Sequence, residues 1–325
     1  MKIIETFDLT KEFNGLKAVD KVNFSVEKGE IYGFLGPNGA GKTTTINMLT
    51  TLLLPTSGTA KVNGYDILED PTEVRRSIGI VPQEIVLEND LTARENLEFH
   101  AELYRVPKKE ARERILELVR LMGLEKRIDD KVATYSGGMK RRLEVVKAFI
   151  HNPAIIFMDE PTQGLDPQTR RVLWDHIKFL NREKNVTIFL TTHYMEEADY
   201  LCDRVGIIDY GKILAADTPE NLKDKTGKGD LIDIGVDDVE VFLEEFKDYS
   251  PEVLKNGTVR LRVLRGEKLL PKILEISQKR GLTISSISLR EPTLEDVFIQ
   301  YTGREIREER GAGISAAFIK KMVKG

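Results

Sequence analysis

The chain has few of the residues that build disulfides and metal centres. It contains one cysteine, Cys202, and four histidines among its 325 residues. A single cysteine excludes an internal disulfide and a multi-cysteine zinc site, and it is typical of a reducing compartment. Four histidines leave little room for a histidine-based metal site. The sequence therefore gives no support to a cofactor held by clustered cysteines or histidines.

Long apolar runs are also lacking. No apolar stretch comes near the length of about 18 residues that a transmembrane helix needs. The N-terminal residues 1–5, Met-Lys-Ile-Ile-Glu, lack the apolar stretch and the small-residue cleavage site of a signal peptide. From these two absences we expect a soluble intracellular protein.

Basic residues also do not outnumber acidic ones. Lys and Arg number 49 against 53 Asp and Glu, which gives a net charge of −4. Broad nucleic-acid binding relies on clustered Lys and Arg, so this balance argues against it. Apolar residues make up 41% of the chain, enough for a substantial core. At about 100–200 residues per domain, the length suggests two domains.

Short apolar runs alternate with helical patterns over the first domain, which we place at residues 1–222. Continuous apolar runs are expected for buried parallel strands, and strands that alternate with helices predict an α/β fold with a mainly parallel sheet. Residues 96–124 have helical periodicity and no strand signal, which predicts an inserted helical subdomain at about residues 84–150. The apolar runs are residues 31–35, 78–81, 154–158 and 186–190.

A polar, glycine-containing linker at residues 223–229 precedes a second, smaller domain. Strand and helix patterns alternate over residues 230–305, which predicts a small α+β accessory domain. Residues 230–248 carry eight acids and one lysine, so we do not expect that face to meet phosphate. Residues 306–325 form a basic, weakly amphipathic tail. The strand patterns are residues 231–236, 258–264 and 283–289, and the helical patterns are residues 239–246 and 270–277.

A glycine-rich segment that follows a predicted strand and opens a predicted helix fits the pattern G-x-x-x-x-G-K-[ST]. That context is what a phosphate-binding loop (P-loop) requires, and it favours this function over an incidental glycine-rich turn. The glycines let the backbone N–H groups and the helix N-terminus point at phosphate oxygens. Lys42 can reach the β- and γ-phosphates, and Thr43 can ligate Mg²⁺. The predicted ATP-binding residues here are Gly36, Pro37, Asn38, Gly39, Ala40, Gly41, Lys42, Thr43 and Thr44.

The apolar strand at residues 154–158 ends in two carboxylates, Asp159 and Glu160. Beside a P-loop, the first carboxylate belongs where Mg²⁺ is supported. The second can then hold and polarise the attacking water. Taken alone, Asp-Glu at a strand end is an ordinary helix cap followed by a solvated acid. The P-loop makes the catalytic interpretation the better one.

Four further segments make the first domain resemble the ATP-binding-cassette (ABC) ATPases. Residues 135–139, Tyr-Ser-Gly-Gly-Met, resemble the signature motif of the family and lie in the helical insert, as the family requires. Gln83 resembles the Q-loop glutamine, residues 164–167 (Gly-Leu-Asp-Pro) resemble the D-loop, and His193 resembles the switch histidine. Together with the P-loop, these motifs follow one another in the order of the family.

The resemblance implies roles for these residues. Phe13 lies where the family stacks an aromatic ring on adenine, although the usual residue is tyrosine; a lone aromatic in such a place is otherwise a core residue. Gln83 would reach Mg²⁺ and the water, His193 would contact the γ-phosphate, and Asp166 would communicate across a dimer. Alone, each of these is an ordinary surface, core or turn residue. We interpret the following acids, 196 and 197, as a solvated helix start.

The signature segment is itself a predicted anion site, because Ser136, Gly137 and Gly138 precede a helix that is expected to begin near Met139. Met139 replaces the usual glutamine of the motif, but the site acts through Ser136 and backbone N–H groups. The P-loop of the same chain already holds one side of the ATP. The resemblance therefore implies a two-fold homodimer with two ATP molecules between P-loop and opposing signature.

The second domain resembles a particular branch of the family. Residues 290–298, Arg-Glu-Pro-Thr-Leu-Glu-Asp-Val-Phe, are similar to the C-terminal accessory domain of ABC ATPases that export drugs, lipids and polysaccharides. The segment also fits a capped amphipathic helix with Leu294, Val297 and Phe298 facing inward, and both interpretations can hold.

Members of that branch are ATPase subunits that pair with a separate integral-membrane permease. The resemblance implies an exporter subunit at the cytoplasmic face of the cell membrane, attached through a permease that docks near Gln83 and residues 91–97. ATP and Mg²⁺ are the implied cofactors.

Two other classes fit part of the sequence. A soluble ABC ATPase that works on nucleic acid or ribosomes usually carries two cassettes or a long coiled coil, whereas this acidic chain has one cassette and a short insert. A P-loop kinase would not explain the presence of residues 135–139 and His193. We expect no nucleic-acid partner, and the residues do not identify the transported compound.

Overall fold

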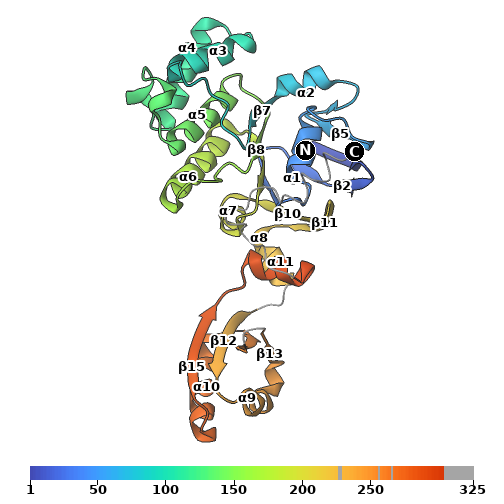
Figure 1. Cartoon of the computed structure of the whole chain (residues 1–325), viewed down its shortest axis with the longest axis vertical. Helices are drawn as coiled ribbons and strands as arrows, with labels where there is room; N and C mark the ends of the chain where they lie inside the picture. Colours follow the sequence, from blue (N-terminus) through green and yellow to red (C-terminus); the bar gives the residue numbers. More distant parts are fainter. Residues whose placement is uncertain (226–228, 255–256, 265, 304–325) are drawn as a thin grey trace, which may run out of the picture.

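The computed structural model describes residues 1–225, 229–254, 257–264 and 266–303. The predicted basic tail at residues 306–325 lies outside the described residues. In Figure 1 the elements β1 to α8 form a larger body, and β12 to β15 with α9 and α10 form a smaller body below it. The last helix, α11 (Leu294–Thr302), returns to the larger body.

A six-stranded sheet forms the centre of the larger body, in the order β11-β10-β4-β9-β8-β7. Neighbouring strands are parallel except β11, which pairs antiparallel with β10. Every residue of β4, β8 and β9 is buried, as expected where both faces of a parallel sheet are covered. This sheet confirms the predicted α/β fold class. The strands are β4 (Ile31–Leu35), β7 (Ile78–Val81), β8 (Ile155–Asp159), β9 (Thr187–Thr192), β10 (Arg204–Asp209) and β11 (Lys212–Asp217).

A second, antiparallel sheet covers one face of the first, and the sequence analysis did not predict it. Its strands follow the order β2-β1-β5-β6, and β3 pairs with β1. An aromatic cluster of Phe24, Tyr32, Phe34 and Phe189 joins the layers, with ring centroids 5.5 to 5.7 Å apart. The strands are β1 (Lys2–Phe13), β2 (Leu16–Val22), β3 (Ser25–Glu27), β5 (Ser57–Val62) and β6 (Tyr65–Asp66).

The helical insert lies between β7 and β8, where the sequence placed it. A capping box at Thr92 and Glu95 starts its first helix, because the two side chains satisfy each other's backbone N–H groups. The insert contains α3 (Ala93–Leu103), α4 (Lys108–Leu121), η1 (Glu125–Arg127), η2 (Val132–Thr134) and α5 (Gly137–Phe149). The other helices of this body are α1 (Lys42–Leu49), α2 (Pro71–Ser77), α6 (Pro167–Lys184), α7 (Met195–Leu201) and α8 (Pro219–Lys225).

The smaller body is an antiparallel sheet in the order β13-β14-β12-β15, packed against two helices. Alternate residues of β12 and β14 point into its core, where they meet Phe242 and Phe246. The strands are β12 (Asp230–Val236), β13 (Glu252–Val253), β14 (Val259–Val263) and β15 (Ile284–Arg290), and the helices are α9 (Val239–Glu245), η3 (Lys247–Tyr249) and α10 (Gly266–Arg280).

Helix α11 follows β15 but packs into the core of the larger body. Its apolar residues Leu294, Val297 and Phe298 are at most 1% exposed and belong to the core cluster that contains Leu201 and Leu222. The amphipathic pattern predicted that these three side chains face inward, and it did not say into which core. The accessory segment predicted at residues 230–305 is thus joined to the larger body through its last helix.

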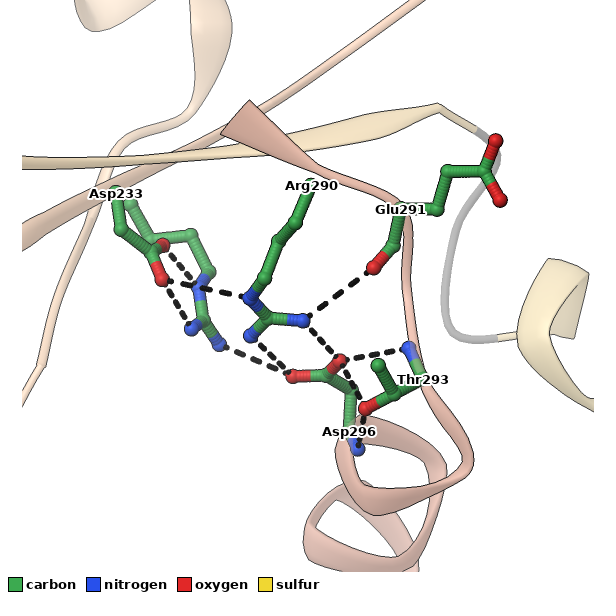
Figure 2. A network of polar contacts seen from close by, with 6 residues as sticks. Asp233, Arg290, Glu291, Thr293 and Asp296 are labelled. Carbon is green, nitrogen blue, oxygen red and sulfur yellow. Dashed lines mark hydrogen bonds and ion pairs between the residues drawn. The ribbon is translucent and has the colours of Figure 1, made fainter. Parts of the chain in front are cut away.

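A network of charged side chains ties the small sheet to the first turn of α11 (Figure 2). The Arg290 guanidinium donates two hydrogen bonds of 2.6 and 2.9 Å to Asp296. Arg260 donates two of 2.6 and 2.8 Å to Asp233. Asp296 also accepts hydrogen bonds from the backbone N–H and the hydroxyl of Thr293, at 2.8 and 2.9 Å, which completes a capping box.

We expect Asp296→Asn to weaken this junction. Burial alone would raise the pKa of Asp296, but hydrogen bonds from Arg290 and Thr293 outweigh it and hold the pKa well below the usual value of 3.8. A lowered folded-state pKa gives stability that is complete above the unfolded-state pKa and is lost as the pH falls. At pH 7 the loss should be about 1–3 kcal/mol, measured by denaturant unfolding.

The difference between wild type and Asp296→Asn should shrink once the pH falls below about 4. Glu295→Gln is the matched control, because Glu295 lies next to Asp296 on α11 and is exposed. If both variants lost the same stability at pH 7, the charged network would not be what holds α11 in place.

Candidate active site

Four of the predicted site segments lie at one edge of the parallel sheet. The P-loop follows β4, His193 follows β9, Glu160 follows β8, and Gln83 follows β7 by two residues. These four strands are neighbours in the order β4-β9-β8-β7. Because the carboxyl ends of parallel strands meet at the same edge, the fold gathers segments that lie far apart in the sequence.

The P-loop needs glycine at two positions where its backbone lies close to a carbonyl oxygen of another segment. Gly41, at φ 103°, precedes α1 without a side-chain cap, so the N–H groups of the first turn are available to an anion. A Cβ atom on Gly41 would lie 2.4 Å from the Ala18 carbonyl oxygen, and one on Gly36 would lie 2.3 Å from the Ile208 carbonyl oxygen. Any side chain at either position would therefore deform the loop.

The Lys42 ammonium lies inside the loop, and the side chain is 4% exposed. It donates hydrogen bonds to the carbonyl oxygens of Gly36, at 2.7 Å, and Pro37, at 3.0 Å. Its third polar contact is the Glu160 carboxylate, at 3.1 Å. Burial lowers the pKa of Lys42, and the Glu160 charge opposes that shift. The loop thus holds a buried cation directly beside the predicted catalytic carboxylate.

Glu160 is fixed between two partners. One carboxylate oxygen lies 3.1 Å from Lys42 Nζ, and the other lies 3.1 Å from His193 Nδ1. Its backbone is in the left-handed region, at φ 47°, which is rare for a residue with a side chain and is typical of functional sites. Burial would raise the pKa of Glu160, but His193 and Lys42 outweigh it and lower the pKa. The carboxylate is therefore held between the P-loop lysine and the residue that follows β9.

Asp159, the last residue of β8, is 6% exposed. Its carboxylate accepts a hydrogen bond from the hydroxyl of Thr191, the residue paired with it in β9. The Glu160 N–H donates to the same hydroxyl at 3.1 Å. One threonine of the neighbouring strand thus orients both acids.

Gln83 is exposed, and its amide donates a hydrogen bond of 2.6 Å to Gln163 Oε1. Gln163 is a residue that the sequence analysis passed over. Its position between Glu160 and the D-loop segment was the feature of the sequence that could have marked it as a site residue. The pair joins the segment after β7 to the segment after β8.

The signature and D-loop segments lie next to each other, and Ser136 and Asp166 are both exposed. Ser136 caps α5, where its hydroxyl accepts a hydrogen bond of 3.3 Å from the Met139 N–H. The helix begins at Gly137, two residues before the predicted start. Asp166 caps α6 and accepts hydrogen bonds from the Thr169 N–H and hydroxyl, at 3.0 and 2.6 Å. A Cβ atom on Gly138 would lie 2.5 Å from Thr169 Cγ2, so the two caps are neighbours.

Phe13 ends β1 with 45% of its surface exposed, and the Lys11 ammonium lies 5.1 Å from its ring centroid. An exposed ring does not fit the alternative of a core residue. Its free face is compatible with stacking on a planar base.

Glu197 differs from the prediction of a solvated helix start. It is fully buried in α7, and it accepts hydrogen bonds from the Thr162 hydroxyl, at 2.7 Å, and from Trp174 Nε1, at 2.8 Å. Burial raises the pKa of Glu197. Trp174 on α6 is itself buried, so this hydrogen bond lies inside the core. Glu197 therefore links the helix after His193 to the segment after Glu160.

No helix within the described residues is long and apolar enough to span a membrane. Two family models match parts of the chain. Residues 19–163 match the ABC transporter model, and residues 218–302 match the model of the C-terminal domain of DrrA1-3-like ATP-binding proteins.

Similar proteins cover nearly the whole chain. The linearmycin resistance ATP-binding protein LnrL of Bacillus subtilis is 38% identical over 94% of this chain and 100% of its own length. The daunorubicin/doxorubicin resistance ATP-binding protein DrrA of Streptomyces peucetius is 38% identical over 93% of each chain. The bacitracin transport ATP-binding protein BcrA of Bacillus licheniformis is 37% identical over 93% of this chain and 97% of its own.

Solved structures resemble the larger body. An ATP-binding subunit of an ABC transporter matches with a TM-score of 0.62 and 32% identity, over 69% of this chain and 93% of that one. The cassette MJ0796, as a dimer in a post-hydrolysis state bound to ADP and phosphate, matches with a TM-score of 0.60 and 29% identity, over 66% and 98%.

Proposed function

The chain belongs to the ABC transporter family of ATP-binding proteins, which hydrolyse ATP, and on that premise we propose that it powers the export of an antibiotic-like compound through a separate membrane permease. The family and its relatives support the ATPase and the export. The compound class rests on the relatives, which are named for linearmycin, daunorubicin and bacitracin. The relatives do not favour the alternatives of a nucleic-acid or ribosome ATPase.

The observation that carries the proposed chemistry is the contact of Lys42, Glu160 and His193 at one edge of the sheet. In the proposed reaction, the P-loop N–H groups and Lys42 bind the phosphates. Glu160, ionised and fixed in place, orients the attacking water and accepts its proton. His193 holds Glu160 and the γ-phosphate in line, which is mainly a positioning contribution. Phe13 stacks on the adenine.

Magnesium fits the donors at the site. The Thr43 hydroxyl, the Asp159 carboxylate and the Gln83 amide offer hard oxygen ligands, which Mg²⁺ prefers, and Mg²⁺ is usually held by one or two protein groups plus substrate phosphates. The described residues contain no cluster of three or more acidic, histidine or cysteine side chains that would form a complete protein cage. Bound there, Mg²⁺ would neutralise charge on the phosphates.

The second half of each ATP site comes from another copy of the chain in this proposal. Ser136 and Gly137 are exposed at the start of α5, where helix N–H groups can bind an anion. They adjoin the Asp166 cap, so the two segments can face a partner's nucleotide together. We place this homodimer at the cytoplasmic face of the membrane, attached to the permease.

Mixing inactive variants tests the shared site. Lys42→Ala damages the P-loop side and Ser136→Glu damages the signature side, so each homodimer should be inactive. A mixed dimer contains one undamaged site. An equimolar mixture should therefore recover roughly a quarter of wild-type phosphate release, because half the dimers are mixed and each has one good site.

A mixture of Lys42→Ala with Glu160→Gln is the matched control, because both changes damage the same side of the site. That mixture should stay inactive. If the first mixture also stayed inactive while both variants were folded and the mixture formed dimers with ATP, the composite site would be wrong.

The compound class is tested in the cell that makes the protein. Replacing the gene by a Glu160→Gln version should increase the retention of at least one compound in a panel of polyketide and peptide antibiotics. Unchanged retention of every compound would contradict the antibiotic-like class and leave the ATPase assignment standing.

A further inference from the structure

The segment that carries Gln83 is irregular and exposed, so it needs another element to hold it. Residues 83–86 follow β7 without helix or strand structure, and all four are exposed. The side chains of Ile85 and Val86 are 40% and 64% exposed. Little of the segment's position therefore comes from burial of its own side chains.

Three side chains on one face of α5 hold the main chain of this segment. Arg141 donates hydrogen bonds to the carbonyl oxygens of Pro82 and Gln83, at 2.6 and 2.5 Å. Glu144 accepts one from the Val86 N–H at 2.7 Å, and Lys147 donates one to the Val86 carbonyl oxygen at 2.6 Å.

The three residues are spaced three apart on the helix, which places them along one side of it. Lys147 also pairs with Glu144 at 2.8 Å. We call Arg141, Glu144 and Lys147 the α5 clamp.

The clamp buries charged side chains, which costs free energy unless hydrogen bonds satisfy them. Arg141 is 4% exposed and Glu144 is fully buried. Burial lowers the pKa of Arg141 and raises that of Glu144. Charged groups are rarely buried unless hydrogen bonds satisfy them. The Arg141 guanidinium is planar with fixed donor directions, so its two bonds fix the peptide groups on both sides of the Gln83 Cα atom in orientation as well as in place.

The neighbouring arginine gives a comparison on the same helix. Arg142 donates a hydrogen bond of 2.8 Å to the Met122 carbonyl oxygen, within the helical insert. Burial lowers the pKa of Arg142 as well. It carries the same charge as Arg141 on the same helix and is half-buried, but its hydrogen bond goes to the helical insert instead of to the segment after β7.

The clamped segment and the signature belong to one helix. Ser136 caps the N-terminus of α5, five positions before Arg141. An α-helix rises 1.5 Å per residue, so Arg141 lies about 7–8 Å along the helix from Ser136. Any shift of α5 that moves Ser136 must therefore carry the Gln83 backbone with it, as long as the clamp holds.

We propose that Arg141 is a positioning residue that locks the Gln83 backbone to the signature helix. When the signature helix moves to bind the second copy's nucleotide, the same movement then brings the Gln83 amide to the magnesium and the water. Glu144 and Lys147 complete the lock at Val86. This inference rests on the proposed function, because it assigns the coupling between the two halves of that composite site.

The test compares Arg141→Met with Arg142→Met in the full chain. Arg141→Met should lower kcat roughly 10-fold or more, since misplacing a positioning group is costly, with the KM for ATP nearly unchanged. The Mg²⁺ concentration for half-maximal turnover should rise several-fold, because Gln83 is a proposed ligand. Arg142→Met should change neither kcat nor the Mg²⁺ dependence by more than about 2-fold. Arg141→Lys, which keeps the charge and a donor, should restore part of kcat.

Equal effects of Arg141→Met and Arg142→Met on kcat and on Mg²⁺ dependence would overturn the proposal, while hydrolysis by the wild type would leave the ATPase function standing. Absence of hydrolysis by the wild type would instead refute that function. If Arg141→Met does not fold, Arg141→Lys against Arg142→Lys decides the question by the same two measurements. A loss of kcat confined to Arg141→Lys, with unchanged affinity for ATP, supports the lock.

Discussion

Glu160→Gln should bind ATP as the wild type does and hydrolyse it about 10²–10⁴-fold more slowly, which is the usual contribution of a general base. The substitution keeps the size of the side chain and an oxygen that can accept a hydrogen bond from Lys42, 3.1 Å away. It removes the negative charge that polarises the water. The rate falls because the base is lost, while the P-loop that binds phosphate keeps its shape.

The trapped complex should be visible as a dimer. Because ATP closes the pair and the variant cannot hydrolyse it, Glu160→Gln with ATP should double in mass by light scattering, and ADP should not produce this change. Glu196→Gln serves as a control, since Glu196 is an exposed acid near His193. Unchanged turnover in Glu160→Gln would remove Glu160 from its catalytic role.

The parts of this site that the sequence could predict are the local ones. A P-loop is one continuous segment, and the fixed spacing of its glycines, lysine and threonine is enough to identify it in a sequence. The position of Glu160 follows from a buried strand that ends in two acids. Continuous apolar runs predicted β4, β8 and β9, because strands covered on both faces need apolar residues at every position.

The antiparallel sheet was missed because its first strand has no regular pattern of apolar residues. In β1, buried residues such as Ile4 and Leu9 alternate irregularly with exposed ones, and bulges interrupt its pairing with β2. Neither the period of two nor a continuous apolar run is present. Such strands form because of the neighbouring strands and side chains that they pack against, so the sequence alone does not identify them.

The missed contacts depend on residues far apart in the sequence. An amphipathic pattern predicts that one face of α11 is buried, yet the surface that covers it comes from α7 and α8. Glu197 and Arg141 were expected at the surface or not considered, because charged residues are rarely buried. Each is buried here because a distant segment supplies its hydrogen bonds: Thr162 and Trp174 for Glu197, and the chain after β7 for Arg141.

Lys42→Ala should abolish nucleotide binding at micromolar concentrations, with a loss in affinity of about 100-fold or more, equivalent to about 2.7 kcal/mol. The ammonium is the buried cation of the P-loop and is bonded to the Gly36 and Pro37 carbonyl oxygens. Its removal takes away the charge that meets the β- and γ-phosphates, and it also deletes two hydrogen bonds that shape the loop. Calorimetric titration with ATP and Mg²⁺ measures the loss.

The same substitution also acts on Glu160, whose pKa is lowered partly by Lys42. Without that cation the pKa of Glu160 should rise, so Lys42→Ala removes the phosphate contact and also changes the electrostatic environment of the proposed base. Lys61→Ala is the control, because Lys61 is exposed on β5. If Lys42→Ala kept its affinity for ATP, residues 36–43 would not form a phosphate-binding loop. If it lost affinity while Lys61→Ala did not, binding would depend on this one buried charge of the P-loop.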